Sequence, residues 1–339
     1  MKRRQPNAKR ENVESFRDKR VLITGGLGFI GSNLARRLVG LGAHVTLMDS
    51  LIPASGGNHF NISDIEGKVR LNISDVRDEH SVKDVVQDKD FLFNLAGQTS
   101  HLDSMQDPYT DLEINLRGQL HILEACRALS PDAKIIFTST RQLYGKPKYM
   151  PVDESHPINC PDVNAVHKLA AEWHHLLYNN VYGLRACVLR LTNTYGPGMR
   201  IRDARQMFVG IWIRQLLEGK PITVYGDGSQ VRDFNYVEDV VEALLLAVAS
   251  DRTSGQVFNL GAEQPLSLRD LAVLMVEVHG SGGYTMVPFQ QQRKTIDIGD
   301  YHGDYSKIRA VTGWEPRMPL RDGLARTLAY YQQHREQYL

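Results

Sequence analysis

The chain has 339 residues, of which 42% are hydrophobic and 23% charged, and its formal net charge is +1. This composition is that of an ordinary globular protein, and the length suffices for one large domain and a smaller lobe. The near-zero net charge argues against a nucleic-acid-binding protein, which needs a basic surface. No apolar run approaches the ~20 residues of a membrane span, so no membrane partner is expected.

Residues 1–18 are expected to form a flexible basic tail. They include Lys2, Arg3 and Arg4 and lack the apolar segment of a signal peptide. The three cysteines of the chain are scattered without the spacing of metal ligands. We therefore expect no metal site, reduced thiols and a cytoplasmic location.

The segment Val21–Gly31 (VLITGGLGFIG) has the pattern of a strand, a glycine turn and a helix. A short apolar run leads into Gly25, Gly28 and Gly31, and a helical pattern with apolar residues on one face follows at once. Glycines allow a tight turn and let a pyrophosphate approach backbone N–H groups at a helix N-terminus, where the dipole favours negative charge. The segment is therefore typical of a dinucleotide-binding unit.

A second apolar run, Ala43–Met48, ends in Asp49, eighteen residues past the last glycine of the turn. A carboxylate at this place hydrogen-bonds a ribose 2′-hydroxyl and repels a 2′-phosphate. The sequence therefore predicts that the cofactor is NAD rather than NADP.

From this point strands and helices alternate, which predicts an α/β fold: a Rossmann-type, doubly wound parallel sheet with helices on both faces. Further strands are expected at Val69–Ile73, Asp90–Leu95, Lys134–Thr138 and Ala186–Leu191. Long helices are expected at Asp111–Leu129, with Leu116, Leu120 and Leu123 on the apolar face, and at Asn164–Val181, with Leu169, Trp173, Leu176 and Leu177 on one face.

The glycine- and proline-rich sequence Tyr195–Gly198 breaks this alternation. After it the elements are shorter and less regular, which predicts a smaller α/β substrate-binding lobe over residues 195–339. The NAD-binding domain is expected over residues 19–194, and segments within about 232–262 are expected to return to its sheet.

From Lys19 to the C-terminus the chain resembles the extended short-chain dehydrogenase/reductases that act on nucleotide sugars, such as UDP-glucose 4-epimerases, CDP-tyvelose epimerases, dehydratases and decarboxylases. The matching motifs stand in the family's order and are TGGLGFIGSN, SDVRD, NLAGQ, FTSTRQLYG, RLTNTYGPG, VYGDGSQVRDFNYVEDV and TGWEP. The resemblance implies a nucleotide-sugar substrate and an NAD site. The residues expected to bind NAD are Gly25, Gly28, Phe29, Ile30, Gly31, Asp49, Asp75, Val76, Leu95, Ala96, Gly97 and Lys168.

The resemblance also implies that Asn193 and Arg232 hold the diphosphate of the substrate. The planar guanidinium of Arg232 suits this role, although an ion pair with Asp233 or Asp239 is the alternative. Further candidates for binding the substrate are Gln98, Tyr225 and Arg293. The aromatic rings of Trp212, Tyr225 and Phe234 are expected either to stack on a base or sugar or to pack in the core.

The family uses a Ser or Thr after the fifth strand and a Tyr-x-x-x-Lys motif on the next helix. The lysine holds the nicotinamide ribose and lowers the pKa of the tyrosine, whose phenolate takes a proton from the sugar. Thr140 and Lys168 match two of these positions, but the tyrosine's position is Asn164. An amide does not act as a base at neutral pH, so the usual proton acceptor is missing.

Tyr144 and Lys148 have the same spacing as the motif, but Pro147 prevents a continuous helix between them. The remaining candidates for the base are His101, Asp103, His167 and a water held by Thr140, Asn164 and Lys168.

The two residues after Thr140 reduce the number of reaction types that the sequence allows. Dehydratases of the family have an Asp-Glu pair there and decarboxylases a glutamate at the second position, whereas this chain has Arg141 and Gln142. An epimerase is therefore expected, with a nucleotide-sugar-binding protein that has lost hydride transfer, or a dehydratase or decarboxylase with relocated acids, as alternatives. Arg141 is expected to stabilise an enolate or to bind a substrate carboxylate, unless it pairs with Asp153 or Glu154.

The helices predicted at 111–129 and 164–181 resemble the pair through which family members form homodimers. A homodimer is therefore expected, with Leu120, Trp173 and Leu177 partly exposed in the monomer.

Overall fold

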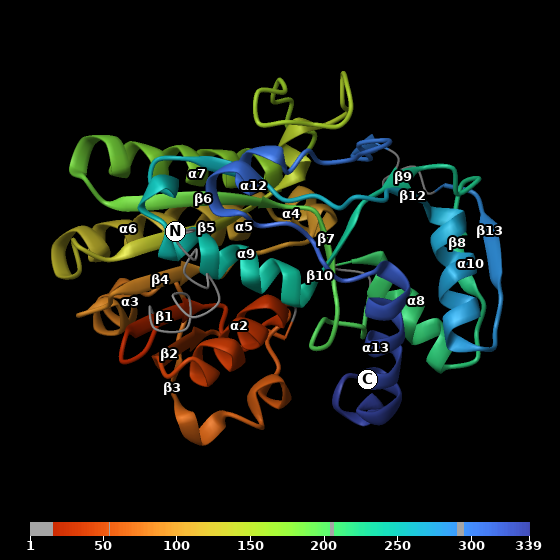
Figure 1. The fold of residues 1–339 in the computed structure, drawn as a ribbon, viewed down its shortest axis with the longest axis horizontal. Helices are drawn as coiled ribbons and strands as arrows, with labels where there is room; N and C mark the ends of the chain where they lie inside the picture. Colours follow the sequence, from red (N-terminus) through yellow and green to blue (C-terminus); the bar gives the residue numbers. More distant parts are fainter. Residues whose placement is uncertain (1–15, 54, 204–206, 290–294) are drawn as a thin grey trace, which may run out of the picture.

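The computed structural model describes residues 16–53, 55–203, 207–289 and 295–339. Seven parallel strands form the central sheet in the order β3-β2-β1-β4-β5-β6-β11 (Figure 1). Their bounds are β1 Arg20–Thr24, β2 His44–Asp49, β3 Val69–Ile73, β4 Phe91–Asn94, β5 Lys134–Thr140, β6 Arg185–Leu191 and β11 Val257–Asn259. The prediction of a Rossmann-type α/β fold is confirmed.

Alternating side chains of β1 separate the two cores of the sheet. Val21 and Ile23 face the helices α2 (Phe29–Gly40) and α9 (Val237–Ala249). Leu22 faces the opposite core, which is covered by α3 (Glu79–Val86), α6 (Gly118–Leu129) and α7 (Val163–Tyr182). The period-2 alternation of a strand thus places one helical layer on each face. The chain returns late to this part of the molecule, where α9 packs on the sheet and β11 pairs with β6.

The helix predicted at 111–129 is not a regular α-helix. The structure has α5 (Pro108–Leu112), a π-helical segment η3 (Glu113–Arg117) and then α6. In the π-helical segment Asn115 is buried and donates from its side chain to Asp111, at 3.0 Å. The predicted apolar face is only partly right, because Leu123 is buried whereas Leu116 and Leu120 are half-buried.

Helix α7 begins and ends where its sequence directs. Asp162 caps its N-terminus by accepting the backbone N–H of Ala165 at 2.8 Å, and Gly183, with φ +74°, ends it in the left-handed conformation. Its predicted apolar face is not the one turned to the sheet, since Trp173 is 65% and Leu177 47% exposed. Small and polar residues face the sheet instead: Asn164, Ala165, Lys168, Ala171, Glu172, His175 and Tyr178.

A second hydrophobic core lies beside the carboxyl ends of the strands (Figure 1). It is built mainly by α8 (Phe208–Leu217), α10 (Leu268–His279), α13 (Leu320–Gln333) and β8 (Ile222–Tyr225). The largely exposed strand β13 (Tyr284–Val287) pairs with β8 in parallel. The short pairs β7 (Asn193–Tyr195) with β10 (Phe234–Tyr236), and β9 (Val231–Arg232) with β12 (Leu266–Ser267), lie between the sheet and this core. Two further short helices are α4 (His101–Gln106) and α12 (Ser306–Thr312).

The described part of the chain starts inside the predicted tail. Phe16 is 1% exposed and its ring lies 5.6 Å from that of Phe91, so ordered packing begins before Lys19. Over the described residues, no helix combines the length and the apolar composition needed to cross a membrane.

Candidate active site

A cavity of about 620 Å³ lies where the carboxyl ends of the strands meet the second core. This is the edge of a doubly wound sheet at which ligands bind. The predicted site residues that line it are Gly25, Gly28, Phe29, Ile30, Gly31, Asp49, Asp75, Val76, Leu95, Ala96, Gly97, Gln98, Thr140, Arg141, Asn164, Lys168, Asn193, Tyr225 and Arg232. Arg293 lies outside the described residues.

The glycine turn between β1 and α2 forms one end of this cavity. Gly25 has φ +69°, and a Cβ at Gly31 would overlap the carbonyl oxygen of Gly25, so neither position accepts another residue without a shift. The N-cap of α2 is Gly28, which has no side chain to occupy the free N–H groups of the first turn. These N–H groups fit the pyrophosphate of a dinucleotide.

Asp49 lies at the end of β2 beside this turn. Its carboxylate accepts the N–H groups of Leu27 and Leu51, each at 3.0 Å. Burial raises the pKa of Asp49, although these hydrogen bonds oppose the shift. The anchored carboxylate suits a ribose hydroxyl and disfavours a phosphate.

Asp75 and Val76, expected at the adenine, line the cavity after β3. The carboxylate of Asp75 is already held by Arg77, at 2.7 and 3.0 Å. Burial acts to raise the pKa of Asp75, but the hydrogen bonds from Arg77 outweigh it and lower the pKa. Val76 is 6% exposed and belongs to the core beneath the cavity.

Lys168 projects from α7 toward the middle of the cavity. Its Nζ donates to the carbonyl of Thr138 at 3.3 Å and lies 4.9 Å from the centre of the Phe137 ring. Burial lowers the pKa of Lys168 to about 8. A Cβ at Gly97 would lie 2.8 Å from this Nζ, so a larger residue in the loop after β4 would displace the Lys168 ammonium.

Thr140 and Ser139 end β5 at the same wall of the cavity. The Thr140 hydroxyl accepts the N–H of Gln142 at 3.1 Å and thereby caps the short turn η4 (Arg141–Tyr144). Among the described residues the buried Oγ of Ser139 has no hydrogen-bond partner. Ser139 was not among the predicted site residues, although it directly precedes the expected catalytic threonine.

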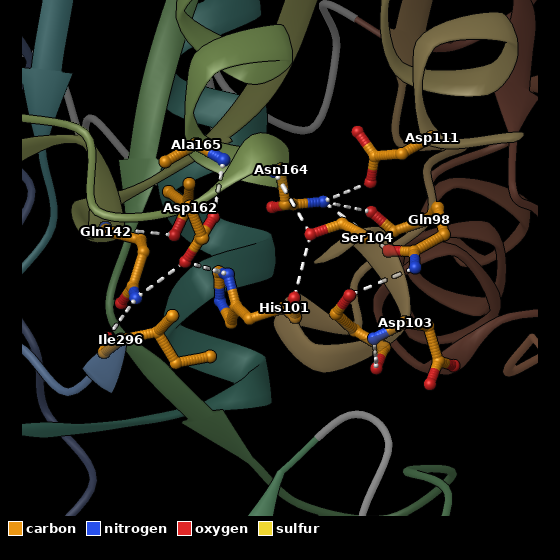
Figure 2. Close-up of polar contacts among 12 residues, drawn as sticks. Gln98, His101, Asp103, Ser104, Asp111, Gln142, Asp162, Asn164, Ala165 and Ile296 are labelled. Carbon is orange, nitrogen blue, oxygen red and sulfur yellow. Dashed lines mark hydrogen bonds and ion pairs between the residues drawn. The ribbon is translucent and has the colours of Figure 1, made fainter. Parts of the chain in front are cut away.

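The amide of Asn164 belongs to a buried polar network (Figure 2). Its Nδ2 donates to the carbonyl of Gln98 at 2.8 Å and to Asp111 Oδ2 at 3.0 Å. The side chain of Asp111 is fully buried and also accepts from Asn115 and from His167 Nδ1, the latter at 2.7 Å. Both partner residues of Nδ2 are acceptors, so the amide oxygen Oδ1 remains available to accept a hydrogen bond. An amide oxygen does not act as a base at neutral pH, so Oδ1 does not take a proton from the substrate.

A second buried carboxylate, Asp162, lies beside His101 (Figure 2). His101 Nδ1 is 3.0 Å from Asp162 Oδ2, and His101 lines the cavity. The other two side chains considered as bases, Asp103 and His167, are not among the lining residues. The structure thus brings only His101 of these three to the cavity wall.

The cationic end of the cavity is formed by Arg141 and Arg232. Arg141 donates to Asn193 Oδ1 at 2.8 Å, and among the described residues no carboxylate lies within ion-pair distance of it. The alternative pairing with Asp153 or Glu154 is therefore wrong. Those two carboxylates instead accept hydrogen bonds from elsewhere, for example from the N–H groups of Ser155 and Asn259.

Arg232 pairs with Asp297 at 3.1 Å and its side chain is 7% exposed. The expected alternative of a surface pair with Asp233 or Asp239 is wrong, because Arg232 is buried and has a different partner. Burial and the nearby charge of Arg141 lower the pKa of Arg232 to about 10.

Among the aromatic candidates, Trp212 and Phe234 are 3% and 7% exposed and belong to the second core. Trp212 also donates from its indole to the carbonyl of Thr223 at 3.0 Å. Tyr225 is half-buried, lines the cavity and lies 6.1 Å from the Phe289 ring. Trp212 also lines the cavity, but its side chain is nearly fully buried, so Tyr225 is better placed than Trp212 or Phe234 to meet a base or sugar.

The model of the NAD dependent epimerase/dehydratase family matches residues 21–261. The chain belongs to this family. It is 30% identical to a putative UDP-glucose 4-epimerase of Methanocaldococcus jannaschii, over 91% of this chain and 97% of the relative. It is 31% identical to a UDP-N-acetyl-alpha-D-glucosaminuronate decarboxylase of Bacillus cytotoxicus, over 93% and 98%.

Solved structures of the family have the same fold. An epimerase of Methanothermobacter thermautotrophicus is 26% identical, and the match covers 96% of each chain with a TM-score of 0.90. A UDP-glucose 4-epimerase of Thermus thermophilus in complex with NAD is 30% identical, covers 92% of this chain and 99% of its own, and has a TM-score of 0.82. This member of the epimerase/dehydratase family is therefore an enzyme that uses NAD, and its relatives include both isomerases and lyases.

In this epimerase/dehydratase family member, sequence reasoning missed the two buried carboxylates, Asp111 and Asp162. One signal was available: Asp162 stands two residues before the expected helix Asn164–Val181, and an aspartate near a helix start is a candidate N-cap. Asp111 gave no such signal, because its role depends on the π-helical segment that follows it.

Proposed function

We propose that the protein is an NAD-dependent nucleotide-sugar epimerase whose active site works without the usual tyrosine. The observation that carries this proposal is the cavity itself. Along the carboxyl edge of the sheet its lining runs from Asp49 and the glycine turn, after β2 and β1, past Lys168, whose Nζ contacts the end of β5, to Asn193 after β6 and to Arg232. This order of groups suits a dinucleotide that meets a sugar diphosphate at the middle of the cavity.

NAD, when bound, accepts a hydride from a sugar carbon and returns it. The glycine turn and Asp49 hold the cofactor, and the Lys168 ammonium donates to its ribose. Thr140 and Asn164 Oδ1 orient the sugar hydroxyl. Asn193 and Arg232 bind the diphosphate, for which the buried guanidinium supplies charge in a low-dielectric site.

Arg141 favours a particular substrate class. It retains its charge at neutral pH, it lines the cavity, and its partner there is the neutral amide of Asn193. A sugar carboxylate would form the direct ion pair with Arg141 that none of the described carboxylates is close enough to form, so a nucleotide-linked uronic acid is the preferred substrate. Neither Arg141 nor Gln142 supplies the acid that elimination needs, which places an isomerase ahead of a lyase.

The test is to incubate the protein with NAD and a panel of nucleotide sugars, neutral and uronic, with UDP, dTDP, CDP and GDP as the nucleotide. Reduced nicotinamide is followed by absorbance and the sugars by NMR. Formation of an epimer supports the proposal. A released carboxyl group or water identifies a lyase instead, and binding without any change in cofactor or sugar identifies a binding protein.

We also propose that two copies associate through α6 and α7. The exposed stripe of α7 includes Val166, Trp173, Leu177 and Val181, each at least 47% exposed. Such a stripe is unfavourable in water. Light scattering should give a dimer for the protein and a monomer for Trp173→Glu, whereas a monomeric parent protein contradicts the proposal.

A further inference from the structure

We propose that His101, held by Asp162, takes the proton of the sugar hydroxyl in place of the missing tyrosine. This inference rests on the proposed redox function and names the base that the function requires.

The imidazole is placed at the cavity wall by a short helix. Ser100 caps α4 by accepting the N–H of Asp103 at 3.2 Å, and His101 is the first residue of that helix. The His101 side chain is 32% exposed, and the residue lines the same cavity as Thr140, Asn164 and Lys168. The ring is therefore accessible to a ligand while its backbone is fixed.

One ring nitrogen is engaged and the other remains available. Nδ1 is enclosed, and 3.0 Å away lies Asp162 Oδ2, at an oblique angle to the N–H direction. Hydrogen bonds of catalytic groups are often poorly aligned without substrate and become straighter in the complex. A carboxylate 3.0 Å from Nδ1 favours a proton on that nitrogen, which leaves the lone pair of the neutral ring on Nε2.

Asp162 is built to stay charged and to keep its position. Its side chain is fully buried, and besides His101 it accepts the N–H of Ala165 at 2.8 Å and the amide of Gln142 at 2.9 Å. Burial acts to raise the pKa of Asp162, but the hydrogen bonds of His101, Ala165 and Gln142 outweigh it and lower the pKa. An anion here stabilises the imidazolium that forms when Nε2 takes a proton.

Ser104 connects the histidine to the position of the missing tyrosine. Its hydroxyl donates to the carbonyl of His101 at 2.8 Å and accepts the N–H of Asn164 at 3.2 Å (Figure 2). The start of α4 and the start of α7 are thereby held together. His101 thus lies on the same side of the cavity as position 164.

The competing groups are engaged elsewhere. His167 forms the same kind of pair with Asp111, at 2.7 Å, but it does not line the cavity. Asp111 is fully buried and accepts from three side chains. Lys168 donates to the carbonyl of Thr138 and lies against Gly97, so its ammonium faces the cofactor side of the cavity.

The step is balanced. The O–H bond of the sugar hydroxyl breaks and its proton goes to His101 Nε2. The C–H bond on the same carbon breaks, both electrons leave with the hydride to the oxidised nicotinamide, and the oxygen forms a C=O bond with the carbon. In the return step the carbon regains a hydride on its opposite face and Nε2 gives the proton back, so no net oxidant is consumed.

The kinetic test compares two histidines that each pair with a buried aspartate. Single-turnover reduction of the cofactor is measured for the parent protein, His101→Gln and His167→Gln, with binding of NAD and of UDP measured by calorimetry. We expect His101→Gln to be slower by at least about 100-fold, the usual contribution of a general base, with both affinities unchanged within about threefold. His167→Gln should lose less than about tenfold.

Two further measurements separate a chemical role from a structural one. In His101→Gly, added imidazole should restore part of the lost rate, which a merely misfolded variant would not allow. In the protein without ligands, ¹⁵N NMR of labelled histidine should show the neutral His101 ring with its proton on Nδ1, and Asp162→Asn should shift that tautomer toward Nε2–H.

The outcomes are distinct. If the parent protein reduces no cofactor with any nucleotide sugar, the proposed function fails and this inference falls with it. If the parent is active and His101→Gln stays within about threefold of it, or if His101 carries its proton on Nε2, the proposed function stands and His101 is not the base. Equal losses in His101→Gln and His167→Gln without imidazole rescue also overturn the inference.

Discussion

Replacing Gly97 by alanine should weaken NAD binding through Lys168. The new methyl carbon would lie 2.8 Å from Lys168 Nζ and 2.9 Å from Asn115 Oδ1. To reach an ordinary contact of 3.4 Å, Nζ must move by about 0.6 Å. Its hydrogen bond to the carbonyl of Thr138 is already 3.3 Å long, so a shift of this size away from that carbonyl breaks it.

A hydrogen bond of a charged group contributes about 1.5–3 kcal/mol, and each 1.4 kcal/mol corresponds to about a tenfold change in affinity. We therefore expect the Kd for NAD, measured by calorimetry, to rise about tenfold in Gly97→Ala. The matched control is Gly40→Ala, because a Cβ at Gly40 meets no atom within 4 Å. An unchanged Kd in Gly97→Ala would refute the role given to Lys168.

Three further predictions concern charged groups. Glu172→Gln leaves the buried Arg190 guanidinium without its carboxylate partner, now at 2.7 Å, and should lower the free energy of unfolding in urea by about 3–5 kcal/mol. Glu124→Gln removes the exposed ion pair with Arg127 and should lower it by less than about 1 kcal/mol. Equal losses of stability in the two variants would contradict this difference between buried and exposed pairs. Burial lowers the pKa of Lys168 to about 8, so its cation is present below that pH and lost above it: the Kd for NAD should rise from about pH 7 to about pH 9, and Lys168→Met should show no such rise. Arg141→Gln should weaken binding of a nucleotide uronic acid about tenfold more than binding of its neutral counterpart. The two Kd values are measured by calorimetry, and an equal loss of affinity for both ligands would contradict the role given to Arg141.

The sheet was predictable because its signals are local. Strand and helix periods, the glycine turn and the aspartate after the second strand all lie within short stretches of sequence. The predicted start and end of Val69–Ile73 agree with β3. Strands β2 and β4 differ from their predictions by one residue at each end, β6 starts one residue earlier, and β5 ends two residues later. The family resemblance, and not a local pattern, indicated Thr140 and Lys168, and both line the same cavity as the glycine turn.

The polar network around Asn164 was not predictable, because it is made by residues distant in sequence. The carboxylate of Asp111 meets an amide and an imidazole from α7, more than fifty positions later. The prediction of which face of α7 is buried was wrong for a related reason. A helix beside an active site turns Lys168 and Glu172 inward, because both find charged or polar partners there, and its large apolar residues are left on the outer side.

The π-helical segment Glu113–Arg117 amounts to one surplus residue in an otherwise α-helical stretch. Deleting a single residue from it would give a continuous α-helix, so the element itself tolerates the loss. All residues before the deletion would then rotate by about 100° around the helix axis relative to α6. Asp111 would move away from Asn164 and His167. A chain shortened by one residue could therefore still form the helix, but its buried carboxylate would no longer contact the active site. The length of this helix, and not only its residues, is thus part of the specification of the site.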